Sequence, residues 1–212
     1  MPDRRPAPVP RLMLVTDRQD TRGRDLVQIA VAAVRGGVDM VQVREKDLET
    51  AELLELASRI VRALPTSALV AINGNALVAA ALEANLHLPA DVPLPASRVW
   101  PLWGRSAHSM KEAVKAAAEQ PDYLLLGTIF PTGSKPGHPG SGLTLVQAVV
   151  QAVSPLPVLA IGGIDETNAA AVIRAGAHGI AVRSAILTAD DPEDAARRLR
   201  RIVDQALVPT HP

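Results

Sequence analysis

The chain has 212 residues, 48% of them hydrophobic and 2% aromatic, and its 22 Lys and Arg balance its 22 Asp and Glu. This length predicts one domain over 11–208, preceded by a disordered tail at 1–10. The charge balance and the scarcity of aromatic side chains argue against nucleic acid or a membrane as partner. The absence of cysteine excludes disulfides, and no apolar stretch is long enough to span a membrane, so a cytoplasmic location is expected.

Short β-branched segments alternate with alanine-rich amphipathic segments from Arg11 onward, as in repeated strand and helix units. The expected strands are Leu12–Val15, Met40–Arg44, Leu69–Ile72, Leu86–Leu88, Trp103–Ser106, Tyr123–Gly127, Val158–Ile161 and Gly179–Val182. The expected helices lie at 24–36, 50–63, 75–84, 109–119, 143–153, 165–175 and 190–206. The segment Pro89–Ser97 has no helical pattern.

Polar or small residues at the strand ends help to decide between a closed barrel and a doubly wound open sheet. They are Thr16 and Asp17, Arg44 to Lys46, Asn73, Ser106 to His108, Thr128, Gly162 and Gly163, and Arg183 and Ser184. A closed barrel brings all these carboxyl ends to one mouth, whereas an open sheet spreads them along an edge. The sequence therefore predicts a single α/β domain, a (β/α)8 TIM barrel with eight parallel strands.

Two neighbouring strand ends carry residues suited to a phosphate. One strand runs into Gly162 and Gly163 and then into the expected helix 165–175, where free amides and the helix start would favour an anion. The next strand ends in Arg183 and Ser184, and the loops after strands seven and eight commonly bind phosphate in such barrels. The simpler interpretation of the glycine pair is a tight turn. The paired second site favours phosphate binding by Gly162, Gly163, Arg183 and Ser184.

Alternation along the second strand places Gln42, Arg44 and Lys46 on one face. Gln42 is expected to point into the barrel, and Arg44 and Lys46 to form a positive rim suited to phosphate or diphosphate. The alternative is a solvated charged loop in which both cations pair with Glu45 and Asp47. Spacing alone leaves the two interpretations open.

The segment Phe130–Gly142 is rich in glycine and proline and is long for a connection between strand and helix. Thr132, Ser134 and Lys135 supply hydroxyl groups and a cation that would close over a bound anion, as a lid does. The alternative is an inert surface loop.

Few side chains are available to carry a proton. His108, after the fifth strand, and His138, in the glycine-rich segment, are placed to reach a ligand and are the candidate catalytic residues. His87 lies within the fourth strand, and His178 precedes the eighth, so both are expected to be structural.

Seven sequence blocks taken together resemble the thiamin phosphate synthase/TenI family. They are Leu14–Asp17, Val41–Lys46, Ala71–Asn73, Arg105–Ser109, Gly127–Thr132, Ala160–Ile164 and Ala181–Ile186, and the likeness runs from about Arg11 to Leu187. The resemblance implies a TIM barrel of thiamin (vitamin B1) biosynthesis, a small-molecule phosphorylated thiazole as ligand, and a homo-oligomer. The substrate-binding residues are then expected to be Gln42, Arg44, Lys46, Asn73, Ser106, Thr128, Thr132, Ser134 and Lys135.

The family contains two activities. Synthases join a pyrimidine diphosphate to a thiazole phosphate with the help of Mg2+, whereas some TenI proteins are aminothiazole tautomerases and move a proton without magnesium. The synthase pattern has an aspartate after the asparagine of strand three, where this chain has Gly74. A second carboxylate follows strand four, where only Asp91 is available. A hard cation needs several oxygen ligands, so no metal and no cofactor are expected.

These departures favour a TenI-like protein with tautomerase-type proton transfer. The tautomerase histidine after strand six is replaced by Thr128, so His108 or His138 would have to carry the proton. The alternatives are a thiamin phosphate synthase using Mg2+ and a non-catalytic thiazole-phosphate sensor. An unrelated sugar-phosphate barrel enzyme would leave the matches at Arg44–Lys46 and Thr132–Lys135 unexplained.

Overall fold

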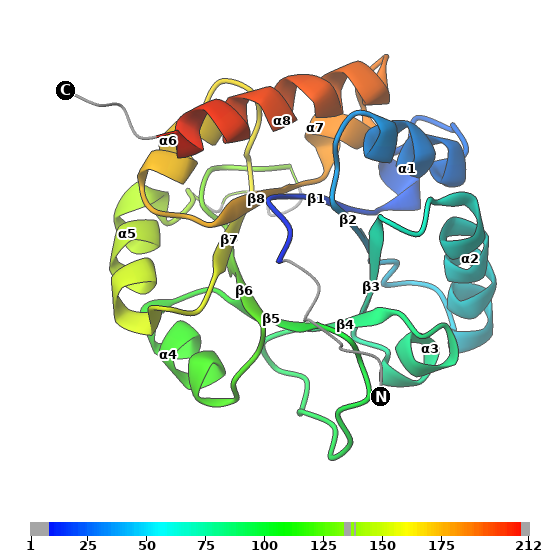
Figure 1. The fold of residues 1–212 in the computed structure, drawn as a ribbon, viewed down its shortest axis with the longest axis horizontal. Coiled ribbons are helices and arrows are strands. Elements are labelled where there is room, and N and C mark those ends of the chain that lie inside the picture. The colour runs from blue at the N-terminus through cyan, green and yellow to red at the C-terminus, as the bar shows by residue number, and fades with distance from the viewer. Residues whose placement is uncertain (1–8, 134–136, 138, 209–212) are drawn as a thin grey trace.

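The computed structural model describes residues 9–133, 137 and 139–208. Eight parallel strands pair in sequence order, and β8 pairs with β1 to close the barrel (Figure 1). The strands are β1 (Leu12–Val15), β2 (Met40–Val43), β3 (Leu69–Asn73), β4 (Asn85–Leu88), β5 (Trp103–Ala107), β6 (Tyr123–Gly127), β7 (Val158–Ile161) and β8 (Gly179–Val182). The predicted (β/α)8 barrel and all eight predicted strands are confirmed to within one residue at each end.

Helices form a ring outside the strands (Figure 1). They are the 3-10 helix η1 (Arg18–Asp20) and the α-helices α1 (Leu26–Arg35), α2 (Thr50–Ala63), α3 (Ala76–Ala81), α4 (Met110–Ala118), α5 (Gly142–Val153), α6 (Ala169–Arg174), α7 (Ser184–Leu187) and α8 (Pro192–Leu207). The predicted tail at 1–10 lies largely outside the described residues, so the domain boundaries stay predictions.

Each strand divides its side chains between the barrel interior and the surrounding helices, because strand side chains alternate. In β1, Met13 and Val15 belong to the interior cluster, whereas Leu12 and Leu14 belong to the cluster shared with the helices. The interior cluster consists of Met13, Val15, Met40, Ala71, Leu102, Tyr123, Leu125, Leu159 and Ala181. The barrel interior is therefore filled by side chains, as in other barrels of this kind.

Side-chain caps explain where several helices begin. The carboxylate of Asp25 accepts a hydrogen bond from the amide of Val27 at 2.7 Å, and Ser109 Oγ accepts one from the amide of Glu112 at 3.2 Å. These caps satisfy amides that have no partner inside the first turn of α1 and α4. Each helix therefore begins at the residue that follows its cap, α1 at Leu26 and α4 at Met110.

The helix after β7 begins later than predicted. The sequence predicts a helix over 165–175, but α6 begins at Ala169. The Asp165 carboxylate instead accepts hydrogen bonds from the amide of Thr167 at 2.8 Å and from its hydroxyl at 2.6 Å. Such a local turn competes with helix formation. The expected contribution of a helix start to an anion site at Gly163 is therefore wrong.

The connection between β4 and β5 has no helix, as predicted for Pro89–Ser97, and it projects between α3 and α4 in Figure 1. The buried Arg105 guanidinium holds this connection in place, because it donates to the carbonyl oxygens of Pro89, at 3.1 Å, and Val92. It also forms an ion pair of 3.0 Å with Glu119. One buried cation thus ties this connection to α4.

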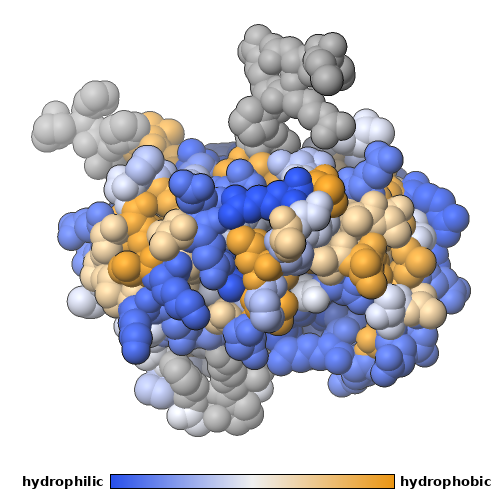
Figure 2. Space-filling view, turned by 90° about the horizontal axis from the view of Figure 1, so that it is seen from below, coloured by the Kyte–Doolittle hydropathy of each residue, from blue (hydrophilic) through white to orange (hydrophobic). Residues whose placement is uncertain are grey.

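Figure 2 shows the side of the molecule that includes α3, α4 and the connection between them. Hydrophobic residues are interspersed with hydrophilic ones on this side. The strongly exposed large hydrophobic residues include Leu77, Val99 and Val114, which come from three different segments. Among the described residues, none of the helices combines the length and the apolar character that crossing a membrane requires.

Candidate functional site at the barrel mouth

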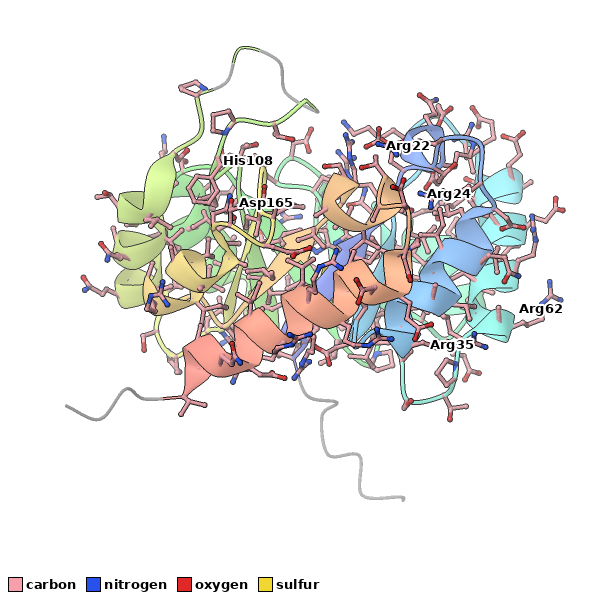
Figure 3. The ribbon with its side chains drawn as sticks, turned by 90° about the horizontal axis from the view of Figure 1, so that it is seen from above. Arg22, Arg24, Arg35, Arg62, His108 and Asp165 are labelled. Carbon is pink, nitrogen blue, oxygen red and sulfur yellow. The ribbon has the colours of Figure 1, made fainter. Side chains whose placement is uncertain are left out.

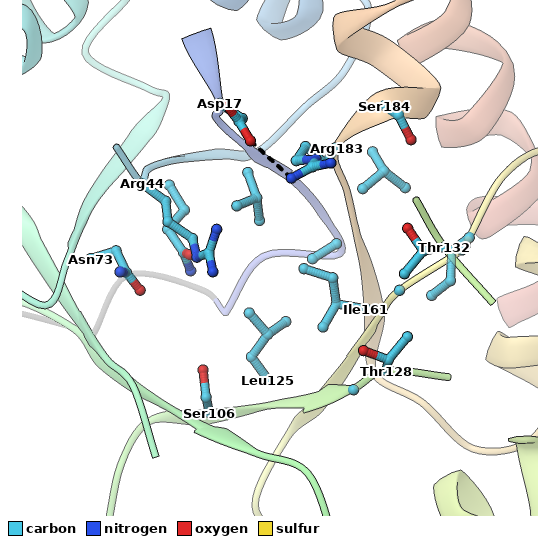
Figure 4. Close-up of a pocket in the computed structure, with 18 of the residues that line it drawn as sticks. Asp17, Arg44, Asn73, Ser106, Leu125, Thr128, Thr132, Ile161, Arg183 and Ser184 are labelled. Atoms are coloured by element: carbon cyan, nitrogen blue, oxygen red, sulfur yellow. Dashed lines mark hydrogen bonds and ion pairs between the residues drawn. The ribbon is translucent and has the colours of Figure 1, made fainter. Parts of the chain in front are cut away.

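A cavity of about 440 Å³ opens at the carboxyl ends of the strands. It is lined by Val15, Asp17, Gln42, Arg44, Lys46, Asn73, Ser106, His108, Leu125, Gly127, Thr128, Thr132, Ile161, Gly162, Gly163, Ile164, Ala181, Val182, Arg183 and Ser184 (Figure 4). Every predicted site residue that the structure describes is in this set. The other three, Ser134, Lys135 and His138, lie outside the described residues.

The glycine pair after β7 forms a turn that other residues would strain. Gly162 has φ +105° and Gly163 has φ +61°, values that favour glycine. Within the described part of the chain, the amide of Gly163 has no acceptor, and neither has that of Ser184 after β8. The pair is a tight turn, and it also leaves donors available at the cavity, so the two interpretations made from the sequence are compatible.

The acidic residues beside Arg44 and Lys46 are engaged elsewhere. The Glu45 carboxylate accepts from the Thr16 hydroxyl at 2.6 Å and from the Arg18 amide at 2.9 Å. Asp47 forms two hydrogen bonds with the Arg18 guanidinium, at 2.6 and 2.7 Å, which lower the pKa of Asp47 to about 2.

Pairing of both cations with these carboxylates is therefore wrong. The guanidinium of Arg44 and the ammonium of Lys46 form no hydrogen bond or ion pair with the residues that the structure describes. Both side chains line the cavity.

Arg44 and Arg183 place two guanidinium groups at one cavity. The Arg44 side chain points into the opening (Figure 4), and burial, followed by the charge of Arg183, lowers the pKa of Arg44. Arg183 forms ion pairs of 2.9 Å with Asp17 and 3.0 Å with Asp20. The described lining thus holds the cations Arg44, Lys46 and Arg183 against the single carboxylate Asp17. This excess of positive charge suits a multiply charged anion.

His108 is exposed and lies at the mouth end of the barrel, where Figure 3 labels it. Its Nδ1 donates to the carbonyl oxygen of Gly127, and its amide donates to Glu112 at 2.8 Å. A neutral His108 therefore keeps Nε2 as its acceptor. His108 lines the cavity, as the sequence predicts. Its role as proton carrier stays a prediction.

His87 and His178 are placed as expected from the sequence. His87 is fully buried inside the barrel, where its Nε2 lies 2.8 Å from Ser106 Oγ. His178 lies at the opposite end, with its Nε2 3.2 Å from the carbonyl oxygen of Val9. Within the described part of the chain, Ser106 is the hydrogen-bond partner of His87 that also lines the cavity.

The burial of His87 predicts a pH-dependent stability. Burial, followed by the charges of Arg44 and Arg105, lowers its pKa from 6.5 to about 3. Below pH 6.5 the unfolded chain binds a proton at this histidine that the folded chain does not, so this group destabilises the fold progressively down to pH 3. We expect His87→Gln to remove about 1.4 kcal/mol of destabilisation per pH unit in that window, measured as the free energy of unfolding against pH. Parallel curves for the two proteins between pH 4 and 6 would contradict this assignment.

The two carboxylates of the synthase magnesium pattern are not brought together among the described side chains. Asp17, the carboxylate in the described lining, is held by Arg183, and Gly74 offers no ligand. Asp91 is exposed and lines a separate cavity of about 250 Å³ together with Arg105 and Glu119. Among the described residues, no group of three histidine, cysteine or acidic side chains could hold a metal ion.

Asp91 is therefore expected to be dispensable. We expect Asp91→Asn to change kcat/KM for the reaction proposed below by less than about twofold, because exposed substitutions away from a site have small effects. Steady-state kinetics over a range of Mg2+ concentrations tests this. A shift of the magnesium dependence in Asp91→Asn would show that Asp91 binds the ion.

Some functional residues were missed from the sequence. The sequence identifies Asp17 only as a polar residue at a strand end, yet Asp17 forms an ion pair with Arg183. Arg18 binds Glu45 and Asp47, which therefore do not line the cavity. The contact between Asp17 and Arg183 could have been predicted from the strand order, because β1 and β8 are neighbours in a closed barrel. No sequence signal distinguishes which cation takes which carboxylate.

Fold and cavity together define a TIM barrel whose mouth, formed by the residues that follow β1, β2, β7 and β8, is positively charged. A family model described as thiamine monophosphate synthase matches residues 12–186. The chain belongs to this family of thiamin biosynthesis, which includes the TenI proteins.

Named relatives agree with this assignment. The chain is 42% identical over 205 residues to a thiamine-phosphate synthase of Mycobacterium sp. (strain KMS), covering 89% of this chain and 90% of that protein. It is also 42% identical over 201 residues to a thiamine-phosphate synthase of Chloroflexus aurantiacus, covering 91% and 92%.

Solved structures extend the comparison. A thiamine phosphate pyrophosphorylase from Pyrococcus furiosus is 33% identical, with a TM-score of 0.82 over 93% of this chain and 97% of that one. A 3-hexulose-6-phosphate synthase from Salmonella typhimurium has a TM-score of 0.74 at 13% identity, over 92% and 99% of the chains, and shows the fold alone. This similarity supports the barrel fold and does not support the alternative that the chain is a sugar-phosphate enzyme.

Proposed function

We propose that this protein is a thiamin phosphate synthase, which couples a pyrimidine diphosphate to a thiazole phosphate. The observation that carries the proposal is the Arg44 guanidinium, which points into the cavity beside Arg183 without a described partner (Figure 4). In the reaction, the bond between the pyrimidine methylene carbon and the diphosphate oxygen breaks, and the electron pair leaves with diphosphate. The thiazole ring nitrogen then gives its lone pair to that carbon and becomes a cation.

Each of the two anionic groups binds to its own part of the cavity. Arg44 and Lys46 bind the diphosphate and stabilise the charge that develops as it leaves. The amides of Gly163 and Ser184, together with Arg183, bind the thiazole phosphate. Burial of Arg44 and its neighbour Arg183 make an anion at this place favourable, since an anion offsets the repulsion between the two cations.

This proposal replaces the TenI-like tautomerase that the sequence favoured. The names of the relatives at 42% identity support the synthase. Coupling also needs no proton carrier, because the attacking ring nitrogen has no proton to lose, so His108 and His138 need not act as bases. A protein of small-molecule biosynthesis fits the expected cytoplasmic location, which we keep in the proposal together with the expected homo-oligomer.

The test is an assay of the purified full chain with both substrates and Mg2+. We expect thiamin phosphate and inorganic diphosphate in equal amounts, at an enzymatic rate. A chain that aromatises the thiazole but forms no coupled product would be a tautomerase, and His108→Ala should then abolish that activity. Binding of the thiazole phosphate without turnover in either assay would indicate a sensor.

A further inference from the structure

Three polar side chains lead from the cavity wall into the barrel core. Ser106 lines the cavity, and its hydroxyl points into the opening (Figure 4). Ser106 Oγ lies 2.8 Å from His87 Nε2, and His87 Nδ1 lies 3.2 Å from the Tyr123 hydroxyl. His87 and Tyr123 are both fully buried. Of the three side chains, only Ser106 is part of the cavity lining.

Packing fixes the two buried rings. The rings of His87 and Tyr123 stack with centroids 5.7 Å apart and planes at 25°. Tyr123 packs over Gly104 of the neighbouring strand, where a Cβ atom would lie 2.1 Å from the Tyr123 Cζ atom. The only other described contact of the Tyr123 hydroxyl is Met40 Sδ, at 3.9 Å. Gly104 therefore makes the room that brings the phenol next to His87.

The direction of the hydrogen bonds among Ser106, His87 and Tyr123 follows from the number of protons that each side chain carries. Burial lowers the pKa of His87 and raises that of Tyr123, so the imidazole is neutral with one N–H and the phenol keeps its proton. The phenol can donate to His87 Nδ1 or to Met40 Sδ. Nitrogen at 3.2 Å is a much better acceptor than a thioether at 3.9 Å. The His87 proton therefore resides on Nε2 and is donated to Ser106 Oγ.

We propose that His87, oriented by Tyr123, is a positioning residue that makes Ser106 a one-way hydrogen-bond donor toward the substrate. Because Ser106 Oγ accepts from His87, its own proton is directed into the cavity. Its partner is an acceptor atom on a heteroaromatic ring, such as an unprotonated ring nitrogen. This ligand class rests on the proposed function, whereas the hydrogen-bond direction does not.

The direction is tested without substrate. The full chain labelled with 15N-histidine reports by NMR which ring nitrogen of His87 carries the proton, and His87→Gln identifies its signals. We expect a single neutral form with the proton on Nε2 between pH 6 and 8. A proton on Nδ1 would overturn the proposal, because Ser106 would then donate to His87 and have no proton left for the substrate.

A double-mutant cycle tests whether His87 acts through Ser106. We expect Ser106→Ala and His87→Leu each to lower kcat/KM for coupling about tenfold, and the double variant to lose no more than either. His87→Gln, whose side-chain amide can donate to Ser106, should recover most of the activity. Leu159→Val, in the same interior cluster, controls for lost packing and should leave kcat/KM within about twofold.

The outcomes separate the two proposals. Losses that multiply in the double variant would overturn the action of His87 through Ser106. A wild-type chain without coupling activity would overturn the proposed function, and the NMR result would still decide the direction of the hydrogen bond.

Discussion

Arg44→Ala is expected to lower kcat/KM for the coupling reaction by about 100- to 1000-fold, the range for losing one preorganised donor that stabilises developing negative charge. The Arg44 guanidinium points into the cavity from a partly buried position, where its interactions with an anion are stronger than in water (Figure 4). Arg44→Lys keeps the charge but loses the planar pair of donors, so it should recover only part of the rate. Steady-state kinetics with each substrate varied in turn measures both effects.

Two arginines at the opposite end of the barrel are matched controls. Arg35 and Arg62 are exposed, and Figure 3 shows them far from His108 and the mouth. Arg35→Ala and Arg62→Ala remove the same charge and should change kcat/KM by less than about twofold. A near-normal rate for Arg44→Ala would contradict the placement of the diphosphate. Equal losses in all three variants would show an effect of net charge instead.

The fold could be predicted because its main determinants are local. Short apolar segments such as β1 are visible in the sequence, and so are the capping residues Asp25 and Ser109. The start of α6 could not be predicted, since a turn made by Asp165 competes with the helix over four residues. The single turn of α7 is too short for a periodic pattern to reveal it.

The membership of the site was predictable, but its pairings were not. A closed barrel brings every strand end to one mouth, so Asn73 and Ser106 could be placed there from their positions alone. Which carboxylate meets which cation depends on three-dimensional distances. Glu45 pairs with the segment after β1 rather than with Arg44, and Asp91 faces away because Arg105 fixes its loop.

Gly162→Ala is expected to lower the free energy of unfolding by about 2–5 kcal/mol. About 1–2 kcal/mol comes from a side chain at φ +105°, and about 1–3 kcal/mol from overpacking. The new Cβ would lie 2.6 Å from Thr128 Cγ2 and 2.9 Å from Thr128 Cα. Gly23→Ala is the matched control, because Gly23 has φ +76° with no atom within 4 Å of such a Cβ, so only the backbone part should appear. Chemical denaturation of both variants measures the difference.

The same pair of variants separates the two roles of the glycine turn. If Gly162 is required by the close approach of the β6 and β7 ends, Thr128→Ser, which removes Cγ2, should recover part of the stability lost in Gly162→Ala. Gly162→Ala should also reduce the rise in unfolding temperature that thiazole phosphate produces, because the strained turn displaces the amide of Gly163. Gly23→Ala should keep that rise in full. An undiminished rise in Gly162→Ala would mean that the phosphate is held by Arg183 and Ser184 alone.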